Sequence, residues 1–71
     1  MALTVILNGQ SKGFEDLTAG ASLVEAIAAL GLQGDRVAVE RNGEIVAREG
    51  WGTSRLFDGD KLEIVHFVGG G

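Results

Sequence analysis

The glycines at positions 69, 70 and 71 raise the first chemical question in this sequence, because they directly follow the apolar segment EIVHFV. Glycine loses more conformational freedom on folding than any other residue, so a glycine run is a poor way to extend a strand. One interpretation is a frayed chain end, since terminal residues are often disordered. The other is that the α-carboxylate of Gly71 is itself the working group, and the remaining residue types must decide between them.

Few other side chains in the sequence could carry chemistry. There is no cysteine, which excludes disulfides and thiolate metal sites. The single histidine, His66, excludes a histidine-based metal cluster; it could donate a proton, but an ordinary strand residue is the favoured interpretation. Asp58 and Asp60 flank Gly59, and two carboxylates without further ligands are more typical of a turn than of a metal site. We therefore expect no catalytic residue, metal or bound cofactor.

Length and composition limit the protein further. A chain of 71 residues forms one domain at most and buries only about 60% of the surface exposed by its unfolded form. Its 45% hydrophobic content favours a packed globule, and its net charge of −4 disfavours nucleic acid and anionic membranes as partners. No apolar run approaches the roughly 20 residues of a membrane span, and the N-terminus lacks the pattern of a signal peptide. We therefore expect a cytoplasmic location and a partner with a basic docking face.

The beginning of the chain reads as a β-hairpin. The pair Asn8-Gly9 is a strong hairpin signal because both residues tolerate positive φ. The surrounding stretch LTVILNGQSKGFEDL therefore predicts two strands. Alternation places Val5 and Leu7 on one face of the first strand and Ile6 on the other.

A helix is predicted over about residues 22–30. Ser22 is a favourable N-cap, and Glu25, three residues later, completes a capping box. Gly31 is placed to end the helix in a left-handed conformation. One face is apolar at helical spacing and is formed by Leu23, Ala26, Ile27 and Leu30.

The second half of the sequence predicts three more strands. An Asn-Gly pair at residues 42–43 joins two short strands within RVAVERNGEIVARE. The last strand, KLEIVHFV, follows a turn at Asp58-Gly59, and in it Leu62 and Ile64 alternate with outward residues. Trp51 lies in the loop before that turn and is expected to pack in the small core.

Together these elements favour an α+β domain with a ubiquitin-like β-grasp fold. We expect a mixed sheet of about five strands, one main helix packed on one sheet face, and the last strand lying beside the first. The opposite sheet face stays open to solvent or to a partner. Residues 1–68 form the globular domain, and residues 69–71 form a flexible tail.

Several motifs in combination give this sequence a family resemblance. They are LNG at residues 7–9, VAVERNGEIVAR at 37–48, Trp51, DGDKLEIV at 58–65, and the final Gly-Gly. A chain that combines them resembles the ThiS family of thiamine-biosynthesis sulfur carriers, which are ubiquitin-like β-grasp proteins. The similarity covers nearly the whole chain.

The resemblance implies a carrier that is not itself an enzyme. A ThiF-like adenylyltransferase would use ATP to convert the Gly71 carboxylate into an acyl-adenylate, and sulfur would then replace AMP to give a thiocarboxylate. A ThiG-like thiazole synthase would take up the sulfur. The glycines suit this role, because Gly69 to Gly71 span roughly 10 Å when extended and carry no Cβ, so they can thread a narrow cleft.

A docking face for such enzymes follows from strand alternation. If Leu62 and Ile64 face the helix, then Val65 and Phe67 lie on the open face near the tail, and Ile6 on the neighbouring strand points the same way. Apolar side chains on an exposed face are typical of a docking site, although a loop could simply cover them.

Three other functions remain open from the sequence. The small subunit of a molybdopterin synthase shares the fold and the Gly-Gly end, but its family tends to be longer. A ubiquitin-like interaction module would leave the tail inert or attach it to lysines. A free-standing enzyme is disfavoured, because the chain offers no catalytic constellation.

Overall fold

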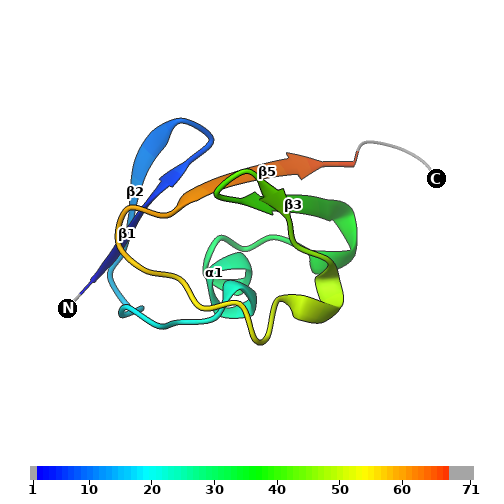
Figure 1. Cartoon of the computed structure of the whole chain (residues 1–71). Helices are drawn as coiled ribbons and strands as arrows, with labels where there is room; N and C mark the ends of the chain where they lie inside the picture. The colour runs from blue at the N-terminus through cyan, green and yellow to red at the C-terminus, as the bar shows by residue number, and fades with distance from the viewer. Residues whose placement is uncertain (1, 68–71) are drawn as a thin grey trace.

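The computed structural model describes residues 2–67, in which one helix lies across one face of a five-stranded sheet (Figure 1). The glycines at 69, 70 and 71, and the predicted boundary between a globular domain and a tail, lie outside the described residues. The strands are β1 (Leu3–Leu7), β2 (Gln10–Phe14), β3 (Val37–Arg41), β4 (Glu44–Ile45) and β5 (Lys61–His66); the helix is α1 (Leu23–Ala29), and two short 3-10 helices are η1 (Gly34–Arg36) and η2 (Arg48–Gly50).

The sheet has the order β2-β1-β5-β3-β4, so the last strand occupies the centre. β5 runs parallel to β1 over only two residue pairs, Ile6 with Lys61 and Leu7 with Leu62. On its other side it pairs antiparallel with β3 over five, from Arg41 opposite Leu62 to Val37 opposite His66. The predicted β-grasp architecture, with the last strand beside the first, is confirmed.

Both Asn-Gly pairs form tight turns with two consecutive residues at positive φ. Asn8 and Gly9 have φ of 48° and 84°, and Asn42 and Gly43 have φ of 51° and 87°. Two positive values in the loop of a two-residue hairpin define the type I′ turn, whose twist matches that of the strands it joins. The two predicted hairpins are therefore confirmed.

The ends of α1 are fixed by the predicted caps. The amide of Glu25 donates to Ser22 Oγ at 3.2 Å, and the amide of Ser22 donates back to Glu25 Oε2 at 2.9 Å, which completes the capping box. Gly31 follows the C-cap with a φ of 73°, as a left-handed C-terminal glycine does. The helix thus lies within the predicted range of residues 22–30.

The core lies between α1 and the inner face of the sheet. Trp51 is only 4% exposed, and its indole Nε1 donates to the carbonyl of Val46 at 2.9 Å, which confirms its packing role. The stretch RVAVERNGEIVARE was predicted to hold two short strands, but its last two residues, Arg48 and Glu49, belong to η2, which is held by bonds such as that from Trp51 N to Arg48 O at 3.1 Å. Within residues 2–67, no helix is long and apolar enough to cross a membrane.

Candidate functional site

The end of β5 presents apolar side chains on the face of the sheet opposite α1. Leu62 and Ile64 are buried in the core, with 0% and 8% exposure. Val65 and Phe67, in contrast, are 61% and 58% exposed. The predicted exposure of these two residues is thus confirmed, and they are the last apolar side chains before the undescribed residues 68–71.

Ile6 shares the open face but lies at its other end. It is partly buried and pairs in register with Lys61 at the start of β5, whereas Val65 pairs with Ala38. Val65 lies four residues further along β5 than Lys61, which corresponds to about 13 Å. The structure therefore brings Val65 and Phe67 together but does not place Ile6 beside them.

The sequence interpretation missed Ile45, which is 79% exposed and is the most exposed large apolar residue described. Ile45 pairs with Glu40, whose side chain is on the open face, so Ile45 lies on that face too. Ala38, Ile45 and Phe67 contribute to one hollow of about 340 Å³ at this side of the molecule. We call Ala38, Ile45, Val65 and Phe67 the apolar patch.

This part of the site could have been found from the sequence by counting through the second turn. A two-residue loop at Asn42-Gly43 pairs Arg41 with Glu44 and then Glu40 with Ile45. Alternation puts Glu40 on the face opposite Val39, and because paired residues share a face, Ile45 must lie on that face too.

Two carboxylates adjoin the apolar patch. Glu40 pairs in register with Glu63, and both side chains are exposed on the open face. Like charges directly opposite each other destabilise a sheet, so this pair does not help the isolated domain to fold. The pair gives this surface local negative charge, in keeping with the net charge of −4.

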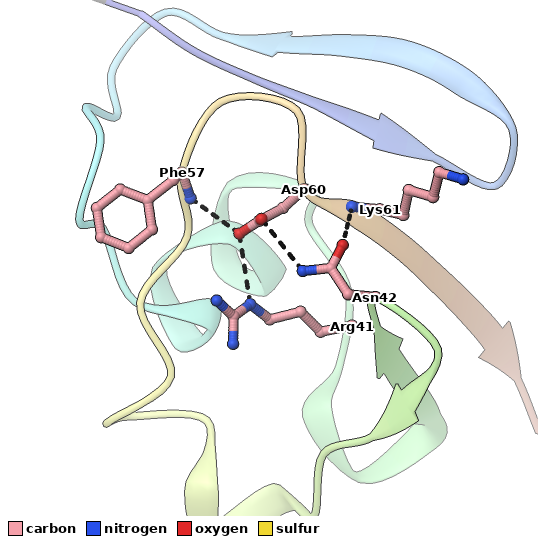
Figure 2. A network of polar contacts seen from close by, with 5 residues as sticks. All are labelled: Arg41, Asn42, Phe57, Asp60 and Lys61. Atoms are coloured by element: carbon pink, nitrogen blue, oxygen red, sulfur yellow. Dashed lines mark hydrogen bonds and ion pairs between the residues drawn. The ribbon is translucent and has the colours of Figure 1, made fainter.

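The start of β5 is held by a polar network around Asp60 (Figure 2). Asp60 accepts hydrogen bonds from the amide of Phe57 at 2.9 Å, from Asn42 Nδ2 at 3.2 Å and from Arg41 Nε at 3.4 Å. Asn42 Oδ1 in turn accepts from the amide of Lys61 at 2.9 Å.

These contacts determine the ionisation of Asp60. Burial alone would raise its pKa, but the Phe57 amide, the Asn42 side chain and the Arg41 guanidinium outweigh burial and hold the pKa below its ordinary value of 3.8. Asp58 likewise accepts from the amide of Thr4 at 2.9 Å. Asp60 therefore closes the turn on itself, whereas Asp58 ties the turn to β1. Among residues 2–67 no three metal-ligating side chains gather at one place.

Asn8 holds the middle of β5 and was not predicted to do so. Its backbone amide donates to the carbonyl of Leu62 at 2.8 Å. Its side chain accepts from the amide of Ile64 at 2.8 Å and donates to the carbonyl of the same residue at 3.2 Å. The side chain thus imitates a strand residue and continues the β1–β5 ladder past the point where β1 ends.

The described structure therefore defines a class: a small ubiquitin-like β-grasp domain with one covered sheet face, one open face, and an apolar patch where the chain leaves the sheet. Comparison with known proteins makes this class more specific. The model of the ThiS family matches residues 5–71, and the chain belongs to that family.

Its relatives include both free-standing carriers and longer proteins. The chain is 40% identical over 65 residues to the sulfur carrier protein ThiS of Bacillus subtilis, covering 92% of this chain and 96% of that one. It is also 39% identical over 69 residues to a thiazole synthase of Paramagnetospirillum magneticum, covering 97% of this chain. It spans only 20% of that relative's length, and the same share of a thiazole synthase from Magnetococcus marinus.

Solved structures agree with this assignment. The crystal structure of a thiamine biosynthesis protein (ThiS) from Geobacter metallireducens superposes with a TM-score of 0.80 at 33% identity, covering 97% of this chain and 100% of that one. The ubiquitin-like fold predicted from the sequence is thus shared with a solved member of the family.

Proposed function

We propose that this chain is a sulfur carrier for the formation of the thiazole ring in thiamine biosynthesis. The observation that carries the proposal is the 40% identity to a sulfur carrier of the same family over 96% of that carrier's length. The chain itself is proposed to be a substrate of enzymes, with no catalytic activity and no bound cofactor. The cytoplasmic location expected from the sequence remains a prediction.

The proposed reaction takes place at the carboxyl carbon of Gly71. A carboxylate is a poor electrophile, so an adenylyltransferase first joins it to the α-phosphate of ATP and releases pyrophosphate. Sulfur at the oxidation level of hydrosulfide then attacks the acyl carbon and displaces AMP, so that a C–S bond replaces the C–O bond to AMP and loss of the S–H proton leaves a thiocarboxylate. The thiocarboxylate holds a nucleophilic sulfur tethered to the carrier, and a thiazole synthase accepts it.

The glycines at 69 and 70 are proposed to thread this carbonyl into the enzyme. Residues 68–71 reach roughly 13 Å from Phe67 when extended. Ordering such a segment costs about 1 to 2 kcal/mol per residue, which contacts made by the globular part must offset. The apolar patch supports this proposal, because it lies where the chain leaves the sheet and its large side chains are exposed.

Thiazole synthase is favoured as a second partner by the relatives that bear its name. Each contains a segment similar to this chain within a protein about five times as long. The exposed Glu40–Glu63 pair further suggests that a partner brings a basic side chain to the open face, since a positive charge would relieve the repulsion between them.

Intact-mass measurement tests the proposed function. The chain is incubated with ATP, a sulfur source and the candidate adenylyltransferase, and we expect the mass increase that accompanies replacement of one oxygen by one sulfur. High-mass conjugates to lysine would instead favour the interaction module. An unchanged mass with every candidate enzyme would contradict the carrier function.

Variants of the tail locate the reacting group. Removing Gly71, or adding one residue after it, is expected to abolish sulfur transfer, because a misplacement of even about 1 Å can reduce a rate about 100-fold. Gly70→Leu is expected to fail by collision with the walls of the cleft. Pyrophosphate exchange and intact mass report the effect, and thermal unfolding serves as the control. Full activity of the extended chain would show that the Gly71 carboxylate is not the working group.

The docking face is tested separately with Phe67→Asp. Phe67 is more than half exposed, so an aspartate there is expected to leave the fold intact and to weaken binding to the activating enzyme. Calorimetric titration measures the binding, and Val24→Asp is the matched control, since Val24 is 47% exposed on α1, away from the patch. Equal binding by wild type and Phe67→Asp would remove Phe67 from the docking face.

A further inference from the structure

The last part of β5 has one side without a neighbouring strand. β1 runs beside β5 only as far as Leu7, opposite Leu62, and then turns away into β2. Figure 1 shows β5 continuing past the β1–β2 hairpin toward the C-terminal end of the chain. β3 lies along the other side of β5 up to His66.

The direction of the backbone groups at His66 follows from its neighbours. Along a strand, the amide and carbonyl of successive residues point alternately to the two sides. The carbonyl of Leu62 and both backbone groups of Ile64 point toward β1, where they bond to Asn8. The amide of Phe67 points the opposite way and donates to Arg36 O at 2.8 Å. The amide and carbonyl of His66 therefore point toward the side that β1 has left.

No described residue, from 2 to 67, forms a backbone or side-chain hydrogen bond with His66 on that side. One step earlier, at Ile64, the same edge is completed by the Asn8 side chain, which supplies one donor and one acceptor. At Ile64, therefore, an amide group from another part of the chain takes the place of a neighbouring strand. At His66 the same pair of groups faces that side without a hydrogen bond from residues 2–67.

We propose that the enzyme that receives residues 68–71 adds an extended segment of its own backbone to this edge of β5. One backbone carbonyl of that segment accepts from the His66 amide, and one backbone amide donates to the His66 carbonyl. Strand addition of this kind uses main-chain hydrogen bonds, so it requires no particular side chain at His66. This inference rests on the proposed function, which supplies the enzyme.

The position of the edge favours this occupant over a second copy of the chain. An enzyme that holds residues 68–71 must already contact the backbone from two residues after His66 onward, and strand addition extends that contact back to His66. Two copies, in contrast, would bring together two domains that each carry a net charge of −4. Paired strands would also fix the direction in which the tail enters the enzyme, which an apolar patch alone leaves free.

Two substitutions of His66 separate the contribution of its backbone amide to binding from that of its side chain. His66→Pro removes the amide hydrogen, and a strand tolerates proline where its amide faces away from the sheet. His66→Ala keeps that hydrogen and removes the imidazole. With the adenylyltransferase that activates the wild-type chain, we expect His66→Pro to bind about tenfold more weakly, as the loss of one hydrogen bond predicts, and His66→Ala to bind like wild type.

Amide hydrogen exchange gives a measurement on the unaltered chain. In the free protein the His66 amide is expected to exchange much faster than the Phe67 amide, which is bonded to Arg36. Binding of the same enzyme is expected to slow exchange at His66. This result does not depend on whether the proline variant folds.

The possible outcomes distinguish failure of the strand-addition proposal from failure of the proposed carrier function. Slowed exchange at His66 together with weak binding by the proline variant supports the added strand. If the wild-type chain is activated but exchange at His66 is as fast in the complex as in the free protein, the strand proposal is wrong and the carrier function stands. Equal loss of binding in the alanine and proline variants would assign the contact to the imidazole and also overturn the proposal. Concentration-dependent protection without enzyme would mean that a second copy occupies the edge.

Discussion

The turn at Asn8-Gly9 and the turn at Asn42-Gly43 share a backbone conformation, and in both the asparagine side chain binds the backbone of β5. They differ in what surrounds the asparagine. Asn8 forms two hydrogen bonds to one residue, Ile64, and no charged group takes part. Asn42 bonds to the amide of Lys61 and also donates to the carboxylate of Asp60, which Arg41 contacts as well.

The comparison shows that the same dipeptide, Asn-Gly, can hold β5 through two different sets of hydrogen bonds. We call these the anchor at Asn8 and the anchor at Asn42. The positive φ of each turn comes from the local sequence, but the strength of the anchor comes from residues far along the chain. The anchor at Asn8 is neutral and should not depend on pH. The anchor at Asn42 includes an ionised carboxylate and should weaken in acid. Three substitutions test this difference, in order of expected effect.

The largest effect is expected for Asn8→Ala. It removes two hydrogen bonds and forces alanine into the left-handed region, which together should lower the free energy of unfolding by about 2 to 4 kcal/mol. Chemical denaturation measures the loss. Asn8→Gly is the matched control, because glycine keeps the backbone conformation and isolates the contribution of the side chain. Stability equal to wild type in both variants would mean that Asn8 does not anchor β5.

A loss of about 2 kcal/mol at neutral pH is expected for Asp60→Ala, which removes the acceptor of three hydrogen bonds. The pKa of Asp60 in the folded chain lies below its ordinary value of 3.8, so folding favours the ionised form. This contribution is fully present above pH 3.8 and is lost as the pH falls through the lower pKa of the folded state.

Denaturation over a pH series checks that sign. The difference between wild type and Asp60→Ala should shrink in acid, whereas the difference between wild type and Asn8→Gly should stay constant. If the stability losses of the two variants change with pH in the same way, the two anchors do not differ in their dependence on charge.

The smallest effect is expected for Arg41→Met. The ion pair is long, at 3.4 Å from Arg41 Nε to Asp60 Oδ2, and the Arg41 side chain is 31% exposed. Partly exposed pairs of this kind contribute about 0.5 kcal/mol or less, and methionine keeps the packing of the arginine stem. Thermal unfolding at low and at high salt measures the contribution. A loss as large as that of Asp60→Ala would mean that the charge of Arg41, rather than the amide donors, holds the carboxylate.

The elements that were predictable from the sequence are those that nearby residues determine. The capping box of Ser22 and Glu25 fixes the start of α1, and each Asn-Gly pair fixes a turn. Alternation correctly separated buried Ile64 from exposed Val65 and Phe67. Each of these features depends on residues within a few positions of one another.

The features that were missed depend on distant pairing. The bonds from Asn8 to Ile64 join residues 56 positions apart, and those from Asn42 to Lys61 join residues 19 apart. Neither pair shows a local pattern. The distance of Ile6 from Val65 was missed for the same reason, because it depends on the register of the parallel β1–β5 pair. Ile45 was the exception, since counting through its own turn would have placed it.

The central position of β5 makes the strand next to the proposed reaction centre indispensable to the fold. Without residues 61–66, the β1–β2 hairpin and the β3–β4 hairpin have no strand between them, and isolated two-stranded hairpins are at best marginally stable in water. A chain cut anywhere in β5 should therefore unfold and be degraded. The folded state therefore requires the strand that leads to Gly71. A chain that has lost this strand should not remain as a folded protein that competes with the intact carrier for the enzyme.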